Sequence, residues 1–334
     1  MKIRLMSDLH IDYNSKYDIK LPQDDVFTLI AGDISGIPSK TIEWINANVK
    51  HGAFCAGNHI VYNPRVFDRA FPEAQTIETI KNTLHEAFPL DNNVTFLDYD
   101  VGVMSKQLDD KTLLIGDVMY TDYKLKIKYL NPKGNVNFNM LLAEPGGRNK
   151  SYLNDFVYGF TDNKKLSIGY KDNTHNLWSL GSKYYKNHHN KAWKELTRIV
   201  EENSDKNIII MTHHCLSTGC ISSSYVNDSL NASYVSNKEN WIKKHPNVKL
   251  ILSGHVHHRT NFKVGETQYV LNPLGYCRYH MLQENPETGK YEMWTPYCHI
   301  DTDTWELTYD PYDNEEWRKI RDMESIYSSF SCFF

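Results

Sequence analysis

The stretch "LILSGHVHHR", residues 250–259, leads a short apolar run directly into a cluster of imidazoles. A run of this length and composition is typical of a buried strand. Three histidines follow it, namely His255, His257 and His258. Taken alone, they fit three interpretations: polar surface residues, hydrogen-bonded core residues, or metal ligands, since neutral imidazole commonly binds transition metals.

Four other short apolar runs end in the same way, with polar side chains that can bind a metal. Segments with the period of a helix lie at 39–50, 75–88 and 190–203. An alternation of strands and helices predicts parallel pairing in a buried sheet, and ligands bind at the carboxyl ends of such strands. The runs are 2–7 before Asp8 and His10, 26–32 before Asp33, 52–57 before Asn58 and His59, and 207–212 before His213 and His214.

Composition limits the classes of protein to which the chain can belong. The 334 residues are 40% hydrophobic with a net charge of −4, which gives no general case for binding nucleic acid or membranes. Six scattered cysteines without a C-x-x-C pair are expected to be reduced thiols. No signal peptide or membrane span is recognisable. We therefore predict a cytoplasmic protein with no membrane partner, while its oligomeric state stays open.

The residue types favour a centre of two metal ions. Carboxylate, amide and imidazole side chains without thiolates suit Mn, Fe, Zn, Co or Ni better than a structural zinc site. The eight candidate ligands are too many for one ion and about right for two. Two metals can clamp a phosphoryl group and activate a bound water molecule.

Five motifs, in a fixed order, resemble those of the calcineurin-like metallophosphoesterase family. They are "DLH" (8–10), "GDIS" (32–35), "GNH" (57–59), "THH" (212–214) and "GHVH" (254–257). The segments "MYTDY" (119–123), "LNDF" (153–156) and "NPLGY" (272–276) look like those of a bacterial and bacteriophage branch, so the resemblance spans residues 1 to about 280. It implies an α/β fold of two packed mixed β-sheets flanked by helices, a four-layer αββα sandwich.

The resemblance also implies a role for each motif residue: three ligands of a first metal, three of a second, one bridge and one acid. Mn²⁺ is the expected cation, with Fe, Zn, Ni and Co as alternatives. His213 is preferred to His214 as a ligand, because it directly follows its apolar run. His214 and His258 are candidates for substrate contact. By this resemblance, Asp8, His10 and His257 bind the first metal, and Asn58, His213 and His255 bind the second. Asp33 bridges the two metals, and His59 is the acid.

Two departures from the family pattern narrow the function. Protein phosphatases of the family carry an arginine soon after the bridging aspartate, whereas this chain has Ser35, Gly36 and Ile37. The departure disfavours a protein phosphatase. Ile60 stands where an acidic residue is common, so the partner that orients His59 stays open.

Local patterns predict further details. We expect Ser39 to cap the first helix and His188 and His189, before the third helical segment, to lie on the surface. Residues 291–300 and 304–310 are predicted to form strands that extend the second sheet.

A basic segment at 124–191 interrupts the chain. It holds twelve Lys or Arg against four Asp or Glu, together with six tyrosines. Such a segment can bind a polyanion whose bases stack on the rings, but a solvated surface segment has the same composition. We predict a single domain over 1–310 with this segment as an excursion, followed by a helical tail over 311–334 that docks on the domain.

Together these patterns predict a phosphoester hydrolase that depends on two divalent metals. We expect a hydroxide that bridges the metals to attack phosphorus, while His59 protonates the departing oxygen. The basic excursion favours a phosphodiester substrate, in a nucleotide or nucleic acid. A phosphomonoesterase is the alternative. A non-catalytic metal-binding scaffold of the same fold is a third reading, although a scaffold has little need of His59.

Overall fold

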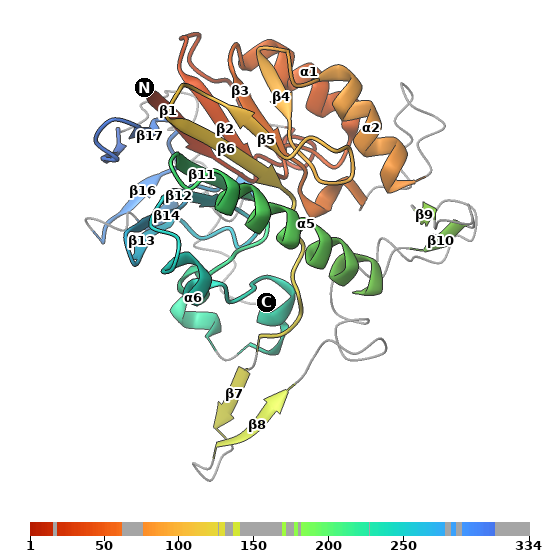
Figure 1. Cartoon of the computed structure of the whole chain (residues 1–334), viewed down its shortest axis with the longest axis vertical. Coiled ribbons are helices and arrows are strands. Elements are labelled where there is room, and N and C mark those ends of the chain that lie inside the picture. The colour runs from red at the N-terminus through yellow and green to blue at the C-terminus, as the bar shows by residue number, and fades with distance from the viewer. Residues whose placement is uncertain are drawn as a thin grey trace, which may run out of the picture.

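In the computed structural model, two six-stranded β-sheets pack face to face, with helices on their outer sides (Figure 1). The predicted four-layer α/β sandwich is therefore confirmed. The predicted tail helix at 311–334 and most of the excursion lie outside the described residues. The structure describes residues 1–15, 19–61, 76–125, 127–130, 136–140, 169–171, 177–179, 182–226, 228–277, 282–284 and 289–310.

The first sheet has the strand order β18-β17-β1-β2-β3-β4. Strands β1 to β4 are parallel, whereas β17 is antiparallel to both β1 and β18. The prediction that the C-terminal strands extend the second sheet is wrong, because β2 occupies only one edge of β1 and β17 takes the other. The bounds are β1 (Lys2–Met6), β2 (Phe27–Ala31), β3 (Gly52–Cys55), β4 (Val94–Phe96), β17 (Cys298–Asp301) and β18 (Leu307–Tyr309).

The second sheet has the order β13-β14-β12-β11-β6-β5. Strands β6, β11, β12 and β14 are parallel, and the outer strands β5 and β13 are antiparallel to their neighbours. The bounds are β5 (Ser105–Gln107), β6 (Thr112–Asp117), β11 (Asn207–Thr212), β12 (Val248–Ser253), β13 (Thr260–Val264) and β14 (Thr267–Leu271).

Aliphatic side chains from both sheets fill the space between them. Because successive side chains of a strand point to opposite faces, Leu5 and Leu29 of the first sheet share one fully buried cluster with Ile209 and Leu250 of the second. Burial of one such side chain contributes roughly 1.5–3 kcal/mol. This contact holds the two sheets against each other.

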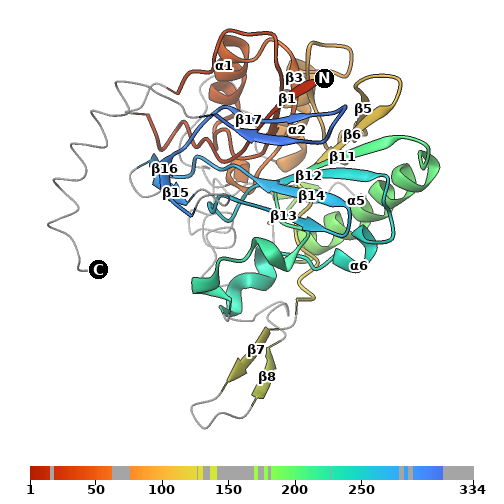
Figure 2. The same cartoon turned by 90° about the vertical axis from the view of Figure 1, so that its left-hand side faces the viewer.

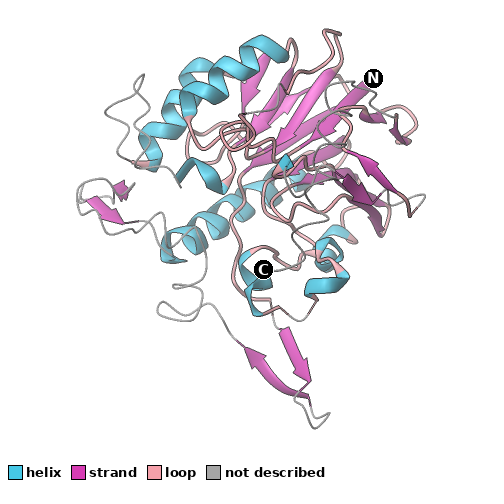
Figure 3. Cartoon of the chain, turned by 180° about the vertical axis from the view of Figure 1, so that it is seen from behind, coloured by secondary structure: helices cyan, strands magenta, loops and turns pink. Residues whose placement is uncertain are grey.

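Helices cover the outer face of each sheet, as the view from behind also shows (Figure 3). Ile45 and Leu84 join the apolar cluster on the first sheet, and Leu196 and Ile242 join the cluster on the second. The helices that carry these residues are α1 (Pro38–Asn48), α2 (Ile77–Ala87), α5 (Ser182–Glu202) and α6 (Glu239–Ile242).

Two helices begin earlier than predicted. α1 begins at Pro38, whose fixed φ suits the first turn of a helix. Ile37 is therefore its N-cap, and the prediction of Ser39 is wrong. α5 begins at Ser182 instead of 190, inside the predicted excursion.

Three two-stranded sheets and four 3-10 helices lie outside the two large sheets in the described part of the chain. The hairpin β7–β8 projects away from both sheets in two perpendicular views (Figures 1 and 2). Among the helices that the structure describes, none combines the length and the apolar character needed to cross a membrane. The remaining bounds are β7 (Ile127–Leu130), β8 (Val136–Met140), β9 (Gly169–Lys171), β10 (Leu177–Ser179), β15 (Leu282–Glu284), β16 (Tyr291–Met293), and the 3-10 helices η1 (Asn58–Val61), η2 (Thr218–Cys220), η3 (Ser223–Tyr225) and η4 (Ser229–Ser233).

Candidate metal centre

The predicted ligands follow the carboxyl ends of β1, β2, β3, β11 and β12. Hydrogen bonds join the loops after these strands. The Asp8 N–H donates to the Gly32 carbonyl over 3.0 Å, and the Gly254 N–H donates to the His213 carbonyl over 3.0 Å. The Asp8 carboxylate also accepts the backbone N–H of His255 at 2.9 Å. These hydrogen bonds therefore hold the loops of both sheets together at one edge.

The backbone at this edge adopts a conformation that residues other than glycine rarely take. Five of the predicted ligands have φ angles between 44° and 72°. Such backbone strain costs about 1–3 kcal/mol per residue and clusters at functional sites, where the surrounding structure imposes it. The five residues are Asp8, His10, Asp33, His255 and His257.

Asp8, His10 and His257 bring their ligand atoms together within 4.8 Å. The Nε2 atoms of His10 and His257 are 2.8 Å apart. The Asp8 Oδ1 atom lies 3.3 Å from the Nε2 atom of His257. Burial, with the positive charges of neighbouring histidines, lowers the pKa of His10 well below its ordinary value, so its ring is neutral at neutral pH. A neutral imidazole beside a carboxylate suits a divalent cation.

Asn58, His213 and His255 form a second group. The Asn58 Oδ1 atom lies 2.7 Å from His213 Nε2 and 3.0 Å from His255 Nδ1. Burial lowers the pKa of His255 well below its ordinary value. Burial also opposes a charge on His213, but the Asp33 carboxylate outweighs it and raises the pKa of His213 to about 9. The position therefore favours a positive charge, which a proton or a metal cation can supply.

Asp33 lies between the two groups. Its Oδ2 atom is 3.2 Å from His213 Nε2, and its carboxylate shares close clusters with Asp8 and with His10. Burial favours the neutral acid, but the charges of His213 and His59 lower the pKa of Asp33 well below its ordinary value. A carboxylate in this place can bridge two cations. The donor set therefore fits a centre of two divalent metals.

His59 lies beside this centre. Its backbone N–H donates to Asp33 Oδ1 over 3.0 Å, and its ring centroid is 4.5 Å from that of His10. The Nε2 atom of His59 is 3.8 Å from Asp33 Oδ2 and 3.2 Å from the hydroxyl of Tyr276. No local pattern predicts that Tyr276, in the segment "NPLGY" (272–276), meets His59.

The two candidates for substrate contact have different surroundings. His214 is buried, with its ring centroid 4.3 Å from that of His255 and its Nδ1 atom 3.3 Å from the Val118 carbonyl. Burial lowers the pKa of His214 to about 3. His258 is half-buried between β12 and β13, and burial lowers its pKa too. Of the two neighbouring histidines, His213 presents its Nε2 atom to Asn58 and Asp33, whereas the Nδ1 atom of His214 faces the Val118 carbonyl.

A buried charged network, which sequence reasoning missed, lies beside the centre. The Nε2 atom of His188 is 3.0 Å from Asp117 Oδ2, and its Nδ1 atom is 3.1 Å from Asp100 Oδ2. Lys81 Nζ donates to Asp100 over 2.8 Å. The prediction that His188 and His189 lie on the surface is wrong, since only 4% and 1% of these residues is exposed. The early start of α5 places both histidines on its packed face.

Tyr120 connects this network to the candidate metal centre. Its ring centroid is 5.2 Å from that of His188 and 5.3 Å from that of His214. Asp117 ends β6, and β6 is paired with β11, which leads into His213. A polar residue at the end of an apolar run is the same signal that marked the ligands, so Asp117 could have been found from the sequence.

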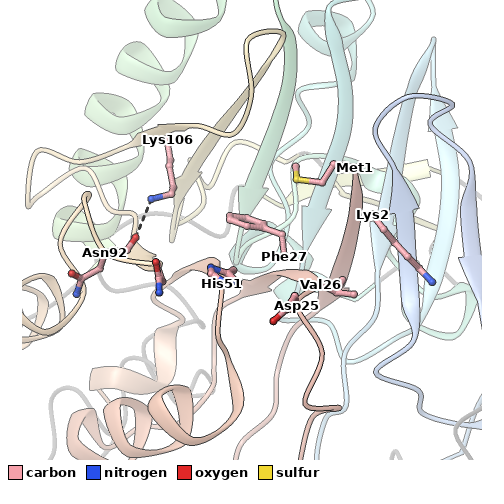
Figure 4. Close-up of a pocket in the computed structure, with 9 residues that line it drawn as sticks. Met1, Lys2, Asp25, Val26, Phe27, His51, Asn92 and Lys106 are labelled. Atoms are coloured by element: carbon pink, nitrogen blue, oxygen red, sulfur yellow. Dashed lines mark hydrogen bonds between the residues drawn. The ribbon is translucent and has the colours of Figure 1, made fainter.

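A surface pocket lies at the opposite edge of the first sheet (Figure 4). Residues at the amino ends of the parallel strands line it, including Val26, His51 and Asn93. Lys106 Nζ donates to the Asn92 carbonyl over 3.2 Å. The side-chain clusters that could hold a metal, within the described residues, lie at the other edge.

A family model described as calcineurin-like phosphoesterase matches residues 1–259 of the chain. Among solved structures, the chain is similar to the phosphopantetheinyl hydrolase of Mycobacterium tuberculosis, with a TM-score of 0.54 and 13% identity over 83% of this chain and 90% of that one. A structure described as a 5′-nucleotidase of Staphylococcus aureus gives a TM-score of 0.42 and 12% identity over 98% of this chain and 58% of that one. No curated protein matches the sequence. The first structural likeness supports the fold.

Proposed function

Because the chain belongs to the calcineurin-like phosphoesterase family, and is thus a metal-dependent phosphoester hydrolase, we propose that two divalent cations bind at the carboxyl edge and that the substrate is a phosphodiester. The convergence of both side-chain groups on Asp33 carries the proposal of two cations. Asp8, His10 and His257 would hold the first cation, Asn58, His213 and His255 would hold the second, and Asp33 would contact both.

Mn²⁺ is the proposed cation, since the oxygen and imidazole donors suit it, with Fe, Zn, Ni and Co as alternatives. When bound, two such cations act as Lewis acids that draw charge from phosphate oxygens and lower the pKa of a water molecule. The chain holds the ligands in place for this chemistry, because five of the seven proposed ligands have strained backbone conformations that the surrounding structure imposes.

His59 is proposed to donate a proton from Nε2 to the leaving ester oxygen. Asp33 supports this role, because its Oδ1 atom accepts the backbone N–H of His59 and so keeps the acid beside the proposed metal ligands. A positioned acid of this kind typically contributes about 10²–10⁴-fold in rate. The contribution is greatest for alcohols that leave poorly as anions.

The preference for a diester rests on the place of the basic excursion. Its first residues follow β6 and the segment around Tyr120, and its last residues belong to α5, whose Tyr185 ring lies 4.2 Å from that of Tyr120. The two described ends of the excursion, at Lys124 and in α5, therefore lie near Tyr120, whose ring is 5.3 Å from that of His214. A basic segment anchored there would attract an extended polyanion, whereas a small monoester has no need of it.

We further propose a single domain over 1–310, with the predicted tail at 311–334 following it. Pairing of β17 with β1 supports this boundary, since it places the end of the described chain in the sheet where the chain begins.

The testing experiment compares Mn²⁺-dependent hydrolysis of bis(p-nitrophenyl) phosphate with that of p-nitrophenyl phosphate, with a chelator as control. The proposal expects a clear preference for the diester. A preference for the monoester would favour the phosphomonoesterase alternative, and metal binding without hydrolysis of either compound would favour the scaffold.

A second experiment tests the proposed acid. His59→Asn should slow hydrolysis of an ester with a poor leaving group by about 10²–10⁴-fold and should slow a p-nitrophenyl ester much less. Full activity of this variant on the poor leaving group would refute the role of His59.

A further inference from the structure

We propose that Tyr13 and Tyr276 form a subsite, beside His59, for a planar aromatic group attached to the leaving oxygen. The inference rests on the proposed function, because it takes His59 as the acid that meets this oxygen. It adds a substrate class, namely esters in which a short linker joins an aryl or nucleobase ring to the leaving oxygen.

Tyr13 places a large, partly exposed aromatic ring beside His59 at the candidate metal centre. The residue lies in the turn after His10, and its N–H donates to the His10 carbonyl over 2.9 Å. Its ring centroid is 5.5 Å from that of His59, with the ring planes at 83°. Even so, 53% of the residue is exposed to solvent. An exposed ring held beside a reacting group offers a flat surface on which another ring can stack.

Tyr276 forms the second wall. It is half-buried, and its ring lies 4.6 Å from that of His10 and 4.9 Å from that of His257, so packing against two proposed ligands fixes its position. Its ring centroid is 5.5 Å from that of Tyr13, at an angle of 63° between the planes. The two rings therefore meet at an angle and do not stack on each other.

The position of the acid determines where the leaving group must lie. An oxygen that takes a proton from His59 Nε2 has to approach it to about 2.6–3.2 Å. The Tyr276 hydroxyl is already 3.2 Å from this nitrogen, so it lies within reach of the same oxygen. The carbon skeleton beyond the oxygen then faces the two tyrosine rings. Stacking on such rings favours flat groups over saturated ones of equal size.

The subsite is tested with two phosphodiesters, methyl 2-phenylethyl phosphate and methyl 2-cyclohexylethyl phosphate, using the full chain with Mn²⁺. The two alcohols have similar acidity and size, so a difference in rate reports recognition of the flat ring. The expected preference for the phenyl ester is about tenfold in kcat/KM, and Tyr13→Leu should abolish it. The matched control is Tyr225→Leu, because Tyr225 is also exposed, at 62%, and lies in η3. This variant should keep the preference.

Tyr276→Phe separates the hydroxyl from the ring. We expect Tyr276→Phe to keep the preference for the phenyl ester, because the ring remains. The variant should lower kcat with little change in KM, because the hydroxyl next to His59 Nε2 is lost. The loss should be larger for 2-phenylethyl than for p-nitrophenyl esters, because only the poor leaving group needs the proton. A purely structural defect would slow both esters equally.

Equal rates for the two esters in the unmodified protein, or an unchanged preference in Tyr13→Leu, would overturn the subsite while leaving the hydrolase intact. If no ester is hydrolysed, the proposed function fails, and calorimetric binding of 2-phenylethylphosphonate and 2-cyclohexylethylphosphonate still decides the subsite. Tighter binding of the phenyl compound, lost in Tyr13→Leu, supports it, and equal binding refutes it.

Discussion

The carboxylate of Asp33 lies 3.2 Å from the Nε2 atom of His213, although Asp33 follows β2 of the first sheet and His213 follows β11 of the second. The contact joins the carboxyl edges of the two sheets. It also places a buried negative charge where both groups of proposed ligands can share it. A cation at this point would satisfy both groups at once.

Substituting Asp33→Asn keeps the shape of the side chain but removes its charge. We expect the variant to retain less metal and to lose more than about 100-fold in activity, since the partners that merely orient metal ligands already contribute 10–100-fold. Metal content after dialysis, measured by plasma mass spectrometry, checks this. Asp25→Asn is the control, because the Asp25 side chain is 81% exposed and pairs with Lys50 elsewhere. Equal metal content in both variants would contradict the bridging role.

Divalent metal should stabilise the folded chain, because the proposed ligands come together only after folding. At a free metal concentration about 100 times the dissociation constant, one site contributes about 2.7 kcal/mol to the free energy of unfolding. Thermal unfolding with Mn²⁺ and with a chelator measures this gain. His257→Gln should reduce it, whereas His51→Gln, in the pocket at the opposite edge, should not. The prediction fails if Mn²⁺ stabilises the His257 variant as strongly as the unmodified protein.

Gly57 packs against the proposed bridge. A Cβ atom at this position would lie 1.9 Å from Asp33 Oδ1, which forces the carboxylate to move. Gly57→Ala should therefore weaken metal binding, measured by calorimetric titration with Mn²⁺. Gly102→Ala is the control, since nothing lies within 4 Å of its added Cβ, although its positive φ costs some stability. Similar Mn²⁺ affinities in the two variants would show that the Asp33 position tolerates the displacement.

His188 should make stability depend on pH. Burial opposes its charge, but Asp117 and Asp100 outweigh this and raise the pKa of His188 from 6.5 to about 10. The protonated form is thus bound more tightly in the folded chain, so its stabilisation is complete below pH 6.5 and is lost as pH rises through about 10. His188→Gln should lower the free energy of unfolding near pH 6 by about 3–5 kcal/mol, as expected for a broken buried ion pair.

Urea unfolding between pH 6 and pH 10 measures this difference. It should shrink toward pH 10, where the unmodified protein loses the same interaction. His51→Gln serves as the control, because His51 is half-buried and lies outside the network. A destabilisation of His188→Gln that stays constant across the pH range would mean that packing, and not charge, explains it.

Local sequence patterns predicted the parallel strands and the polar residues at their ends. A buried strand must be apolar along its length, and a site at its carboxyl end must be polar, so both appear as local patterns of a few residues. For this reason the residues predicted as ligands, such as Asp33 and His255, are the ones that the structure brings together. The capped start of α2 at Thr76 is equally local.

Contacts between distant segments arise only when the whole chain has folded. Tyr276 reaches His59 across 217 residues of sequence, and no local period encodes such a meeting. β17 joined the first sheet because one edge of β1 was available to it. His188 became buried because α5 begins earlier than its apolar period suggests and because Asp117 offers a charge to pair with. These outcomes depend on which surfaces meet after the sheets have packed, and that is a property of the assembled fold.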